Sequence, residues 1–240
     1  MCHKGGFWCK LSALLLALAL IVPILAACGG GKKETAATRS PVPTATSQPG
    51  MALTPTITPQ RTATTIAGWR KLEGGGVALS LPESWIGGDL SKDLDMIVGK
   101  IRALGPNYEQ MARLIEQNRS AFLMYVLDPQ VGDSGFLTNI NIVTEQVPSA
   151  ITIDIYLDAA IKQLPAEFSV RERGTVPLGP QQAGRLVLEA TIMGQQVKEL
   201  MYVIKNGSVV RVVTYATGAG EFERRLPVFE QSIRTFEIRP

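Results

Sequence analysis

Histidine and cysteine are nearly absent from this sequence, and the few copies lie at its start. One His and three Cys occur among 240 residues. Cys2, His3 and Cys9 precede a long apolar run, so Cys28 is the last cysteine and no histidine follows His3. If the front segment is removed, the remaining chain has no imidazole base, no His metal ligand, no CxxC site and no internal disulfide. We therefore expect a protein that is not an enzyme and holds no metal or cofactor.

The front of the chain, residues 1–27, has the order of segments that is typical of a bacterial export signal. Lys4 and Lys10 supply positive charge, and an uncharged apolar run follows over residues 11–27. Pro23 interrupts this run, which is shorter than the about 20 apolar residues that a spanning helix needs. We therefore predict a lipoprotein-type signal peptide over 1–27, with an uncleaved signal anchor as the alternative.

The apolar run ends in Leu25-Ala26-Ala27-Cys28, which resembles the lipobox of bacterial lipoproteins. The resemblance implies a diacylglyceryl group on the Cys28 sulfur and cleavage between Ala27 and Cys28. The freed amine is then open to a further acyl chain such as palmitate, and two acyl chains hold a protein stably at a bilayer. The implied location is a cell membrane, with the chain lipid-anchored on the extracytoplasmic face, or an outer membrane if the cell has one. On the alternative interpretation, Cys28 is incidental.

Residues 28–66 differ sharply in composition from the run before them. Between 29 and 66 there are ten Thr, five Pro and no aromatic residue. Such a segment buries too little apolar surface to offset its chain entropy, so we predict a disordered tether. A flexible coil of this length spans roughly 35 Å. The tether has an excess of basic residues. We interpret it as a solvated spacer, with contact between its basic residues and anionic lipid as the alternative. Whether its Thr and Pro residues carry O-linked sugar is left open.

Residues 67–240 are predicted to form one globular domain, which is long enough to bury a core without a disulfide or a metal. The domain contains 18 Lys and Arg against 20 Asp and Glu, a net charge of −2. Its basic residues form no stripe, which argues against a nucleic-acid partner.

Hydrophobic periodicity divides the domain into strands and helices. Strands are predicted at 77–81, 121–127, 136–147, 168–176, 184–193, 196–205 and 208–217. Helices are predicted at 91–104, 107–118, 154–164 and 221–236. Asn206-Gly207 lies between two β-branched runs and predicts a two-residue hairpin, because both turn positions need positive φ. Strand hairpins with helices inserted at intervals predict an α+β fold, an antiparallel β-sheet flanked by helices.

Two stretches of the domain resemble the PsbP-like, or Mog1/PsbP, family. Residues 77–85 (VALSLPESW) are similar to its opening strand-Pro-Trp signature, and 200–236 to its closing pair of strands and C-terminal helix. The resemblance covers 69–240 and rests on hydrophobic pattern and a few aromatics. It implies an α-β-α sandwich around an antiparallel sheet, so the whole chain looks like a bacterial lipoprotein with a PsbP-like C-terminal domain. Family members have unrelated roles, and no single function follows from the fold.

Several short motifs suggest chemistry but have simpler structural interpretations. Residues 132–135 (GDSG) match the nucleophile motif of chymotrypsin-like proteases, yet without a histidine they are interpreted as a loop. Residues 74–76 (GGG) lack the Lys-Ser/Thr of a phosphate loop and are interpreted as a flexible lead into the first strand. Asp89, Asp93 and Asp95 lack the EF-hand spacing and are interpreted as a polar loop that caps a helix. Six aromatic residues are interpreted as core, with lining of a ligand cleft as the alternative: Trp69, Trp85, Tyr125, Tyr156, Tyr202 and Tyr215.

The sequence identifies no ligand-binding residue. The lipid anchor, the spacer and the missing catalytic residue types favour a non-catalytic binding or docking module in the cell envelope, with an envelope protein as its partner. The alternative is a carrier of a small apolar ligand or lipid in a cleft between the sheet and a helix. An enzyme built on carboxylates and Lys is the third hypothesis.

Overall fold

The computed structural model of the chain describes residues 66–192 and 194–239. The predicted signal peptide, the lipobox with Cys28 and the tether up to residue 65 lie outside the described residues. Within the described part of the chain, no helix combines the length and the apolar character needed to cross a membrane.

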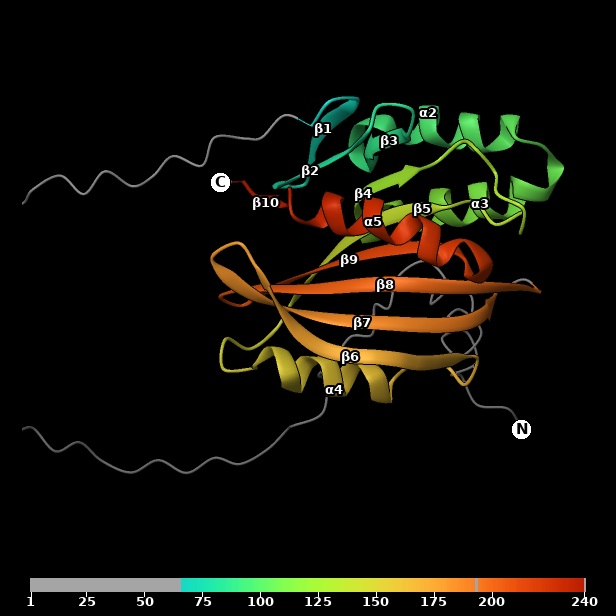
Figure 1. The fold of residues 1–240 in the computed structure, drawn as a ribbon. Coiled ribbons are helices and arrows are strands. Elements are labelled where there is room, and N and C mark those ends of the chain that lie inside the picture. The colour runs from blue at the N-terminus through green and yellow to red at the C-terminus, as the bar shows by residue number, and fades with distance from the viewer. Residues whose placement is uncertain (1–65, 193, 240) are drawn as a thin grey trace, which may run out of the picture. The chain divides into compact units, whose positions relative to one another are not determined.

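The centre of the fold is a seven-stranded antiparallel sheet with the order β3-β4-β5-β9-β8-β7-β6 (Figure 1). Its strands are β3 (Ile86–Asp89), β4 (Phe122–Leu127), β5 (Asn139–Gln146), β6 (Phe168–Leu178), β7 (Gln181–Ile192), β8 (Gln195–Asn206) and β9 (Val209–Gly218). The sequence predicts six of these strands and misses β3. The predicted β8–β9 hairpin is confirmed, but Asn206 pairs with Val209, so the turn residues are Gly207 and Ser208. Gly207, at φ 60, supplies the positive φ at the first turn position.

A second, three-stranded antiparallel sheet has the order β1-β2-β10, with β1 (Trp69–Gly74), β2 (Val77–Pro82) and β10 (Glu237–Ile238). The sequence predicts only β2. The interpretation of residues 74–76 as a flexible lead is wrong, because Gly74 ends β1 opposite Val77. Gly75 and Gly76, at φ 54 and 73, form the tight turn between the two strands. Two consecutive positive φ values favour glycine at both positions.

Four α-helices occur in the described residues: α2 (Leu90–Ala103), α3 (Glu109–Gln117), α4 (Ile153–Lys162) and α5 (Phe222–Ile233). Three short 3₁₀ turns accompany them: η1 (Pro106–Tyr108), η2 (Arg119–Ala121) and η3 (Ala219–Glu221). All four helices are predicted from the sequence, with ends that differ by one to three residues. Pro227 lies inside α5, as the sequence pattern requires.

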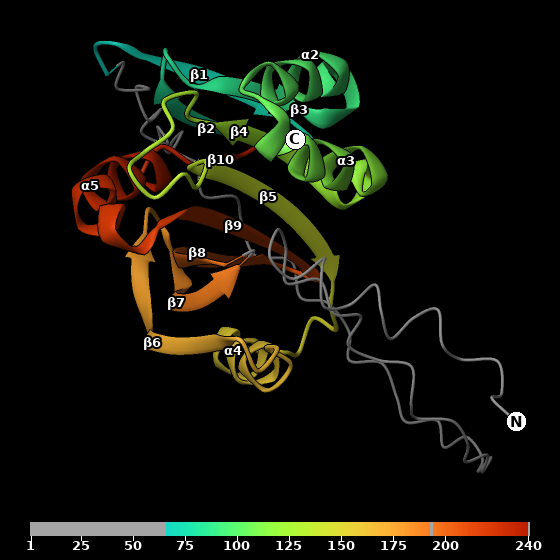
Figure 2. The same ribbon diagram turned by 90° about the vertical axis from the view of Figure 1, so that its right-hand side faces the viewer.

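The seven-stranded sheet is covered on both faces (Figure 2). Helices α2, α3 and α4 pack on one face, and α5 with the small sheet packs on the other. Successive side chains of a strand point to opposite faces. In β9, for example, Val212 belongs to the core under α2–α4, and Val213 belongs to the core under α5. The predicted class, an antiparallel sheet flanked by helices, is confirmed.

Strand β6 forms one edge of the seven-stranded sheet. The register of its pairing with β7 shifts between Val170 and Glu172, which marks a β-bulge. Arg171, Glu172 and Arg173 are exposed, and Pro177 lies near the end of the strand. This edge is therefore charged, bulged and interrupted by a residue without a backbone N–H.

Candidate functional site

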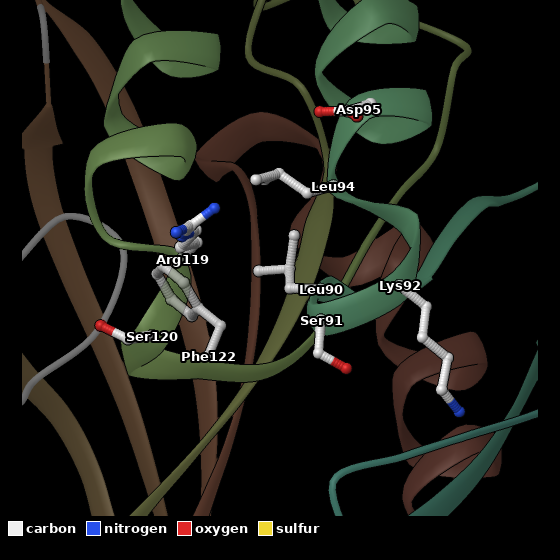
Figure 3. A pocket seen from close by; sticks show the side chains of 8 residues that line it. All are labelled: Leu90, Ser91, Lys92, Leu94, Asp95, Arg119, Ser120 and Phe122. Atoms are coloured by element: carbon white, nitrogen blue, oxygen red, sulfur yellow. The ribbon is translucent and has the colours of Figure 1, made fainter.

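A hollow of about 500 Å³ lies between the first turns of α2 and the corner where η2 runs into β4 (Figure 3). Leu90 and Leu94 of α2 point toward the ring of Phe122 at the start of β4 and give the hollow an apolar lining. Charged side chains also line it: Lys92, Asp95 and Arg119. The volume falls in the range of about 300–1,000 Å³ that is typical of small-ligand pockets. We call this feature the α2 hollow.

Asp89 fixes the start of α2 and thereby the position of the α2 hollow. Its Oδ1 accepts hydrogen bonds from the Ser91 backbone N at 2.9 Å and from the Ser91 Oγ at 2.7 Å. Burial tends to raise the pKa of the Asp89 carboxyl, but the hydrogen bonds from Ser91 and the charge of Lys92 outweigh it and lower that pKa below its usual value. Asp89 caps this helix as predicted, but the predicted polar loop is wrong, because Asp89 ends β3 and Asp93 and Asp95 lie inside α2.

The three acidic residues of this region do not converge on one point. Asp89 caps the helix, the Asp93 carboxylate lies against Gly88, and Asp95 lines the α2 hollow. Across residues 66–192 and 194–239, no group of three or more His, Cys, Asp or Glu side chains has the arrangement of a metal site.

The cations of the α2 hollow differ in how they are paired. The Lys92 Nζ lies 3.6 Å from the Asp89 Oδ2. The exposed Arg119 forms no hydrogen bond or ion pair with any other residue that the structure describes. The hollow therefore presents a free guanidinium group beside an apolar surface.

Four polar side chains lie together on the sheet face that α2–α4 cover, and we call them the polar row. Tyr125 of β4 is opposite Asn141 of β5, and Asn141 is opposite Thr214 of β9. Glu199 of β8 is opposite Ala216, two residues along from Thr214. Cβ atoms of opposite residues lie about 5 Å apart and those of diagonal neighbours about 7–8 Å apart, so the row is contiguous.

The polar row is buried and incompletely paired. Tyr125, Asn141 and Glu199 are 0%, 1% and 3% exposed. Among the described residues, the Tyr125 hydroxyl and the Asn141 Oδ1 have no hydrogen-bond partner, and Glu199 forms no hydrogen bond or ion pair. Burial raises the pKa of Glu199 to about 8 and also raises the pKa of Tyr125. Each unpaired buried group costs about 1–3 kcal/mol of stability, so the row weakens the fold.

Ser134 of the GDSG motif holds a loop in place. Its Oγ donates a hydrogen bond to the Glu221 Oε1 at 3.0 Å and accepts one from the Phe136 backbone N at 3.1 Å. Glu221 is 4% exposed and lies at the start of α5. A Cβ at the neighbouring Gly132 would lie 1.9 Å from the Glu221 Oε1, so a larger residue there would displace that carboxylate. The interpretation of residues 132–135 as a loop is confirmed.

Five of the six aromatic residues singled out in the sequence are buried, as the core interpretation predicts: Trp85, Tyr125, Tyr156, Tyr202 and Tyr215. Trp69 is partly exposed. The Tyr215 ring lies 6.4 Å from the ring of Tyr202 and 5.0 Å from that of Phe229. None of the six lines the α2 hollow, where the aromatic residue is Phe122. The alternative that these residues line the cleft is therefore not supported at this hollow.

The comparisons with known proteins give fold neighbours at low similarity. No protein-family model and no curated protein matches the chain. Cyanobacterial PsbP (CyanoP) from Synechocystis sp. PCC 6803 is 12% identical, with 74% of this chain and 96% of that chain covered and a TM-score of 0.45. LpqN of Mycobacterium tuberculosis, described as involved in cell envelope biogenesis, is 14% identical over 68% of this chain and 83% of that chain, with a TM-score of 0.43.

The Saccharomyces cerevisiae Ran-binding protein Mog1p is 10% identical over 71% of this chain and 95% of that chain, with a TM-score of 0.39. PsbP and Mog1 proteins, which the sequence resembles, are thus both among the solved structures with a similar chain path. Because all three TM-scores lie below 0.5, no function is transferred from these proteins.

Proposed function

We propose that this chain is a non-catalytic, lipid-anchored binding module of a cell envelope, in which the sandwich domain docks a protein partner. The observation that carries the docking role is the α2 hollow, where Leu90, Leu94 and Phe122 form an apolar lining next to an unpaired Arg119. Pockets that accept an apolar anchor from a partner commonly dominate the energy of a protein interface. The lipobox at Cys28 supports the anchoring, and the Thr- and Pro-rich segment supports a tether.

The residue types of the chain support a non-catalytic role. No histidine or cysteine follows Cys28, and Ser134 is engaged by Glu221 and by a backbone N–H. The Glu221 carboxylate accepts the hydrogen bond of the Ser134 hydroxyl, but a carboxylate is ordinarily a weaker base than an imidazole, so it activates a serine poorly.

The surface of the α2 hollow indicates the chemistry of the partner. An aliphatic or aromatic side chain of the partner would fill the space between Leu94 and Phe122. An acidic residue flanking that anchor would pair with Arg119, which has no counter-charge of its own in the described part of the chain. Such charge complementarity adds mainly to specificity and to the rate of association.

A charged residue in the α2 hollow is expected to abolish docking. We expect Leu94→Asp to reduce the amount of partner recovered from cross-linked membranes by at least about tenfold, because it removes part of the apolar lining and gives Arg119 a carboxylate of its own chain to pair with. Met96→Asp is the matched control, because Met96 lies on the same helix, is 42% exposed and does not line the hollow. Equal recovery with both variants would contradict docking at this hollow. Circular dichroism of both variants checks that the fold is retained.

A carrier of a small apolar ligand or lipid is the second candidate function, and the volume of the α2 hollow, about 500 Å³, favours it specifically. This function predicts a co-purifying hydrophobic mass in native mass spectrometry of the full chain released gently from detergent. The mass would be lost from Leu94→Asp and kept in Met96→Asp. A clean mass of the unliganded protein supports docking of a protein partner instead.

Lipid anchoring makes its own prediction. Cys28→Ala removes the only thiol at which the lipid can be attached, so we expect the variant to leave the membrane fraction or to remain unprocessed. Cys9→Ala lies within the predicted signal peptide and is the control that should stay membrane-bound at mature size. Fractionation and intact-mass analysis measure both properties. A Cys28→Ala protein that is fully membrane-bound at mature size would show that the anchor is not this cysteine.

A further inference from the structure

Two oppositely charged side chains line the α2 hollow without pairing with each other. Asp95 lies on the wall formed by α2, and Arg119 lies on the wall formed by η2 (Figure 3). Both side chains are exposed, and within the described part of the chain neither forms a hydrogen bond or an ion pair. The hollow therefore offers an unpaired negative charge on one wall and an unpaired positive charge on the other.

The other polar side chains on the α2 wall of the hollow are already engaged. The Lys92 Nζ lies 3.6 Å from the Asp89 Oδ2, and Figure 3 shows the Lys92 side chain directed away from the apolar lining. The Ser91 Oγ donates a hydrogen bond to the Asp89 Oδ1 at 2.7 Å. Asp95 and Arg119 are thus the charged groups of the lining that remain open to an occupant.

The openness of the α2 hollow favours an occupant that belongs to a larger molecule. Most of the residues that line the hollow are exposed to solvent: Ser91, Lys92, Asp95, Arg119 and Ser120. A small-ligand pocket commonly buries about 70–90% of its ligand, which requires more enclosing walls. A side chain that projects from a protein partner needs no such enclosure, because the partner itself covers the open side.

The two unpaired charges select the chemistry of that occupant. A purely apolar group would remove water from Asp95 and Arg119 without pairing either of them, and the desolvation of an unpaired charge is costly. An occupant with charges of one sign would pair with one wall and be repelled by the other. The complement of the hollow is therefore an apolar group flanked by an acidic group on the η2 side and a basic group on the α2 side.

We propose that the occupant of the α2 hollow is a segment of the partner protein in which an apolar anchor residue lies between an acidic and a basic residue. The acidic residue would pair with Arg119 and the basic residue with Asp95, while the anchor would lie against Leu90, Leu94 and Phe122. This inference rests on the proposed docking function and adds that the segment binds in one orientation. The reversed segment would place like charges together on both walls.

A charge-swapped variant of the full chain tests the orientation. Asp95→Arg combined with Arg119→Asp keeps the apolar lining and the net charge of the hollow and exchanges only the two signs. Recovery of the partner from cross-linked membranes should fall by at least about tenfold, because both walls then repel the segment. Exchanging the acidic and the basic residue of the recovered partner's segment should restore its capture by the swapped chain.

Neutral variants and a matched control separate the charges from a structural effect. Asp95→Asn and Arg119→Gln should each reduce recovery about two- to threefold, as expected for one exposed ion pair. These losses should shrink when the salt concentration is raised from about 0.15 M to about 1 M, since screening shortens the range of the charges. The control combines Lys100→Asp with Glu167→Arg, at exposed positions that do not line the hollow, and should leave recovery unchanged.

The outcomes distinguish this inference from the docking function on which it rests. If Leu94→Asp abolishes recovery but the swapped chain recovers as much partner as the parent, docking stands and the orientation is overturned. Higher recovery with Asp95→Asn than with the parent would indicate an occupant with acidic groups alone and would also overturn the inference. Equal recovery with Leu94→Asp and Met96→Asp would overturn docking and the inference together.

Discussion

The difference in folding stability between a Glu199→Gln variant and the parent chain is expected to shift by about 3 kcal/mol in favour of the variant when the pH rises from 4.5 to 7. Burial raises the pKa of the Glu199 carboxyl from 4.5 to about 8 in the folded protein. A raised pKa means that folding favours the protonated form. This contribution is complete below pH 4.5 and is lost at about 1.4 kcal/mol per pH unit as the pH rises toward 8. Glutamine does not titrate and loses nothing over this window.

Urea unfolding of both chains at several pH values between 4.5 and 8 measures this difference. Any constant effect of the amide cancels, because only the change of the difference with pH is compared. Glu83, which is exposed in the turn between β2 and β3, supplies the control, since Glu83→Gln makes the same chemical change outside the core. Parallel pH profiles for the parent and Glu199→Gln would show that the Glu199 side chain is solvated in the folded protein, contrary to its 3% exposure.

A Gly87→Ala variant is expected to lose about 3 kcal/mol of stability or more. Gly87 lies in β3 at φ 135, a backbone conformation that favours glycine. A Cβ at this position would lie 2.2 Å from the Tyr125 carbonyl oxygen and 2.7 Å from the Val126 Cα, and neither backbone atom can move freely within β4. Because β3 leads directly into α2 through Asp89, the α2 hollow should be distorted as well.

Thermal unfolding checks the Gly87 prediction, with an expected decrease in Tm of about 6 °C or more. Gly99→Ala is the matched control, because Gly99 is exposed inside α2 and a Cβ there meets no atom within 4 Å. That variant should gain up to about 1 kcal/mol from the better helix propensity of alanine. Equal melting temperatures for Gly87→Ala and the parent would mean that β3 does not approach β4 this closely.

The long elements of the fold are predictable from the sequence because their own side chains define them. β8 and β9 are buried on both faces, so they are nearly continuous apolar runs, and α3 and α4 have apolar residues at helical spacing. The β8–β9 turn is predicted one residue too early, because Asn206 remains in the ladder opposite Val209.

The missed strands are those that depend on distant partners. β1 contains three charged residues among six, and β3 contains two glycines among four, so neither has an apolar pattern of its own. β10 is two residues long and pairs with β2, from which it is separated by most of the domain. Pairing with another strand, rather than local propensity, makes these segments strands.

The residues of the candidate sites are hard to predict for the same reason, because they meet only in the folded chain. The α2 hollow joins Leu90 and Leu94 with Arg119 and Phe122, residues that the turn between α2 and α3 brings together, and no motif connects them. Glu199 does leave a trace in the sequence, as a single acidic residue within the apolar run 197–204. An acidic residue at an inward position of a predicted buried strand is a sign that could have identified the polar row.

The bulged, charged edge of β6 affects whether two copies of the chain can pair through their strand edges. Free strand edges join across molecules when their N–H and C=O groups line up over several residues. The shifted register after Val170 and the ring of Pro177 interrupt such alignment. At high local concentration, copies of the chain would therefore remain separate molecules along this side, rather than merging into a continuous intermolecular sheet.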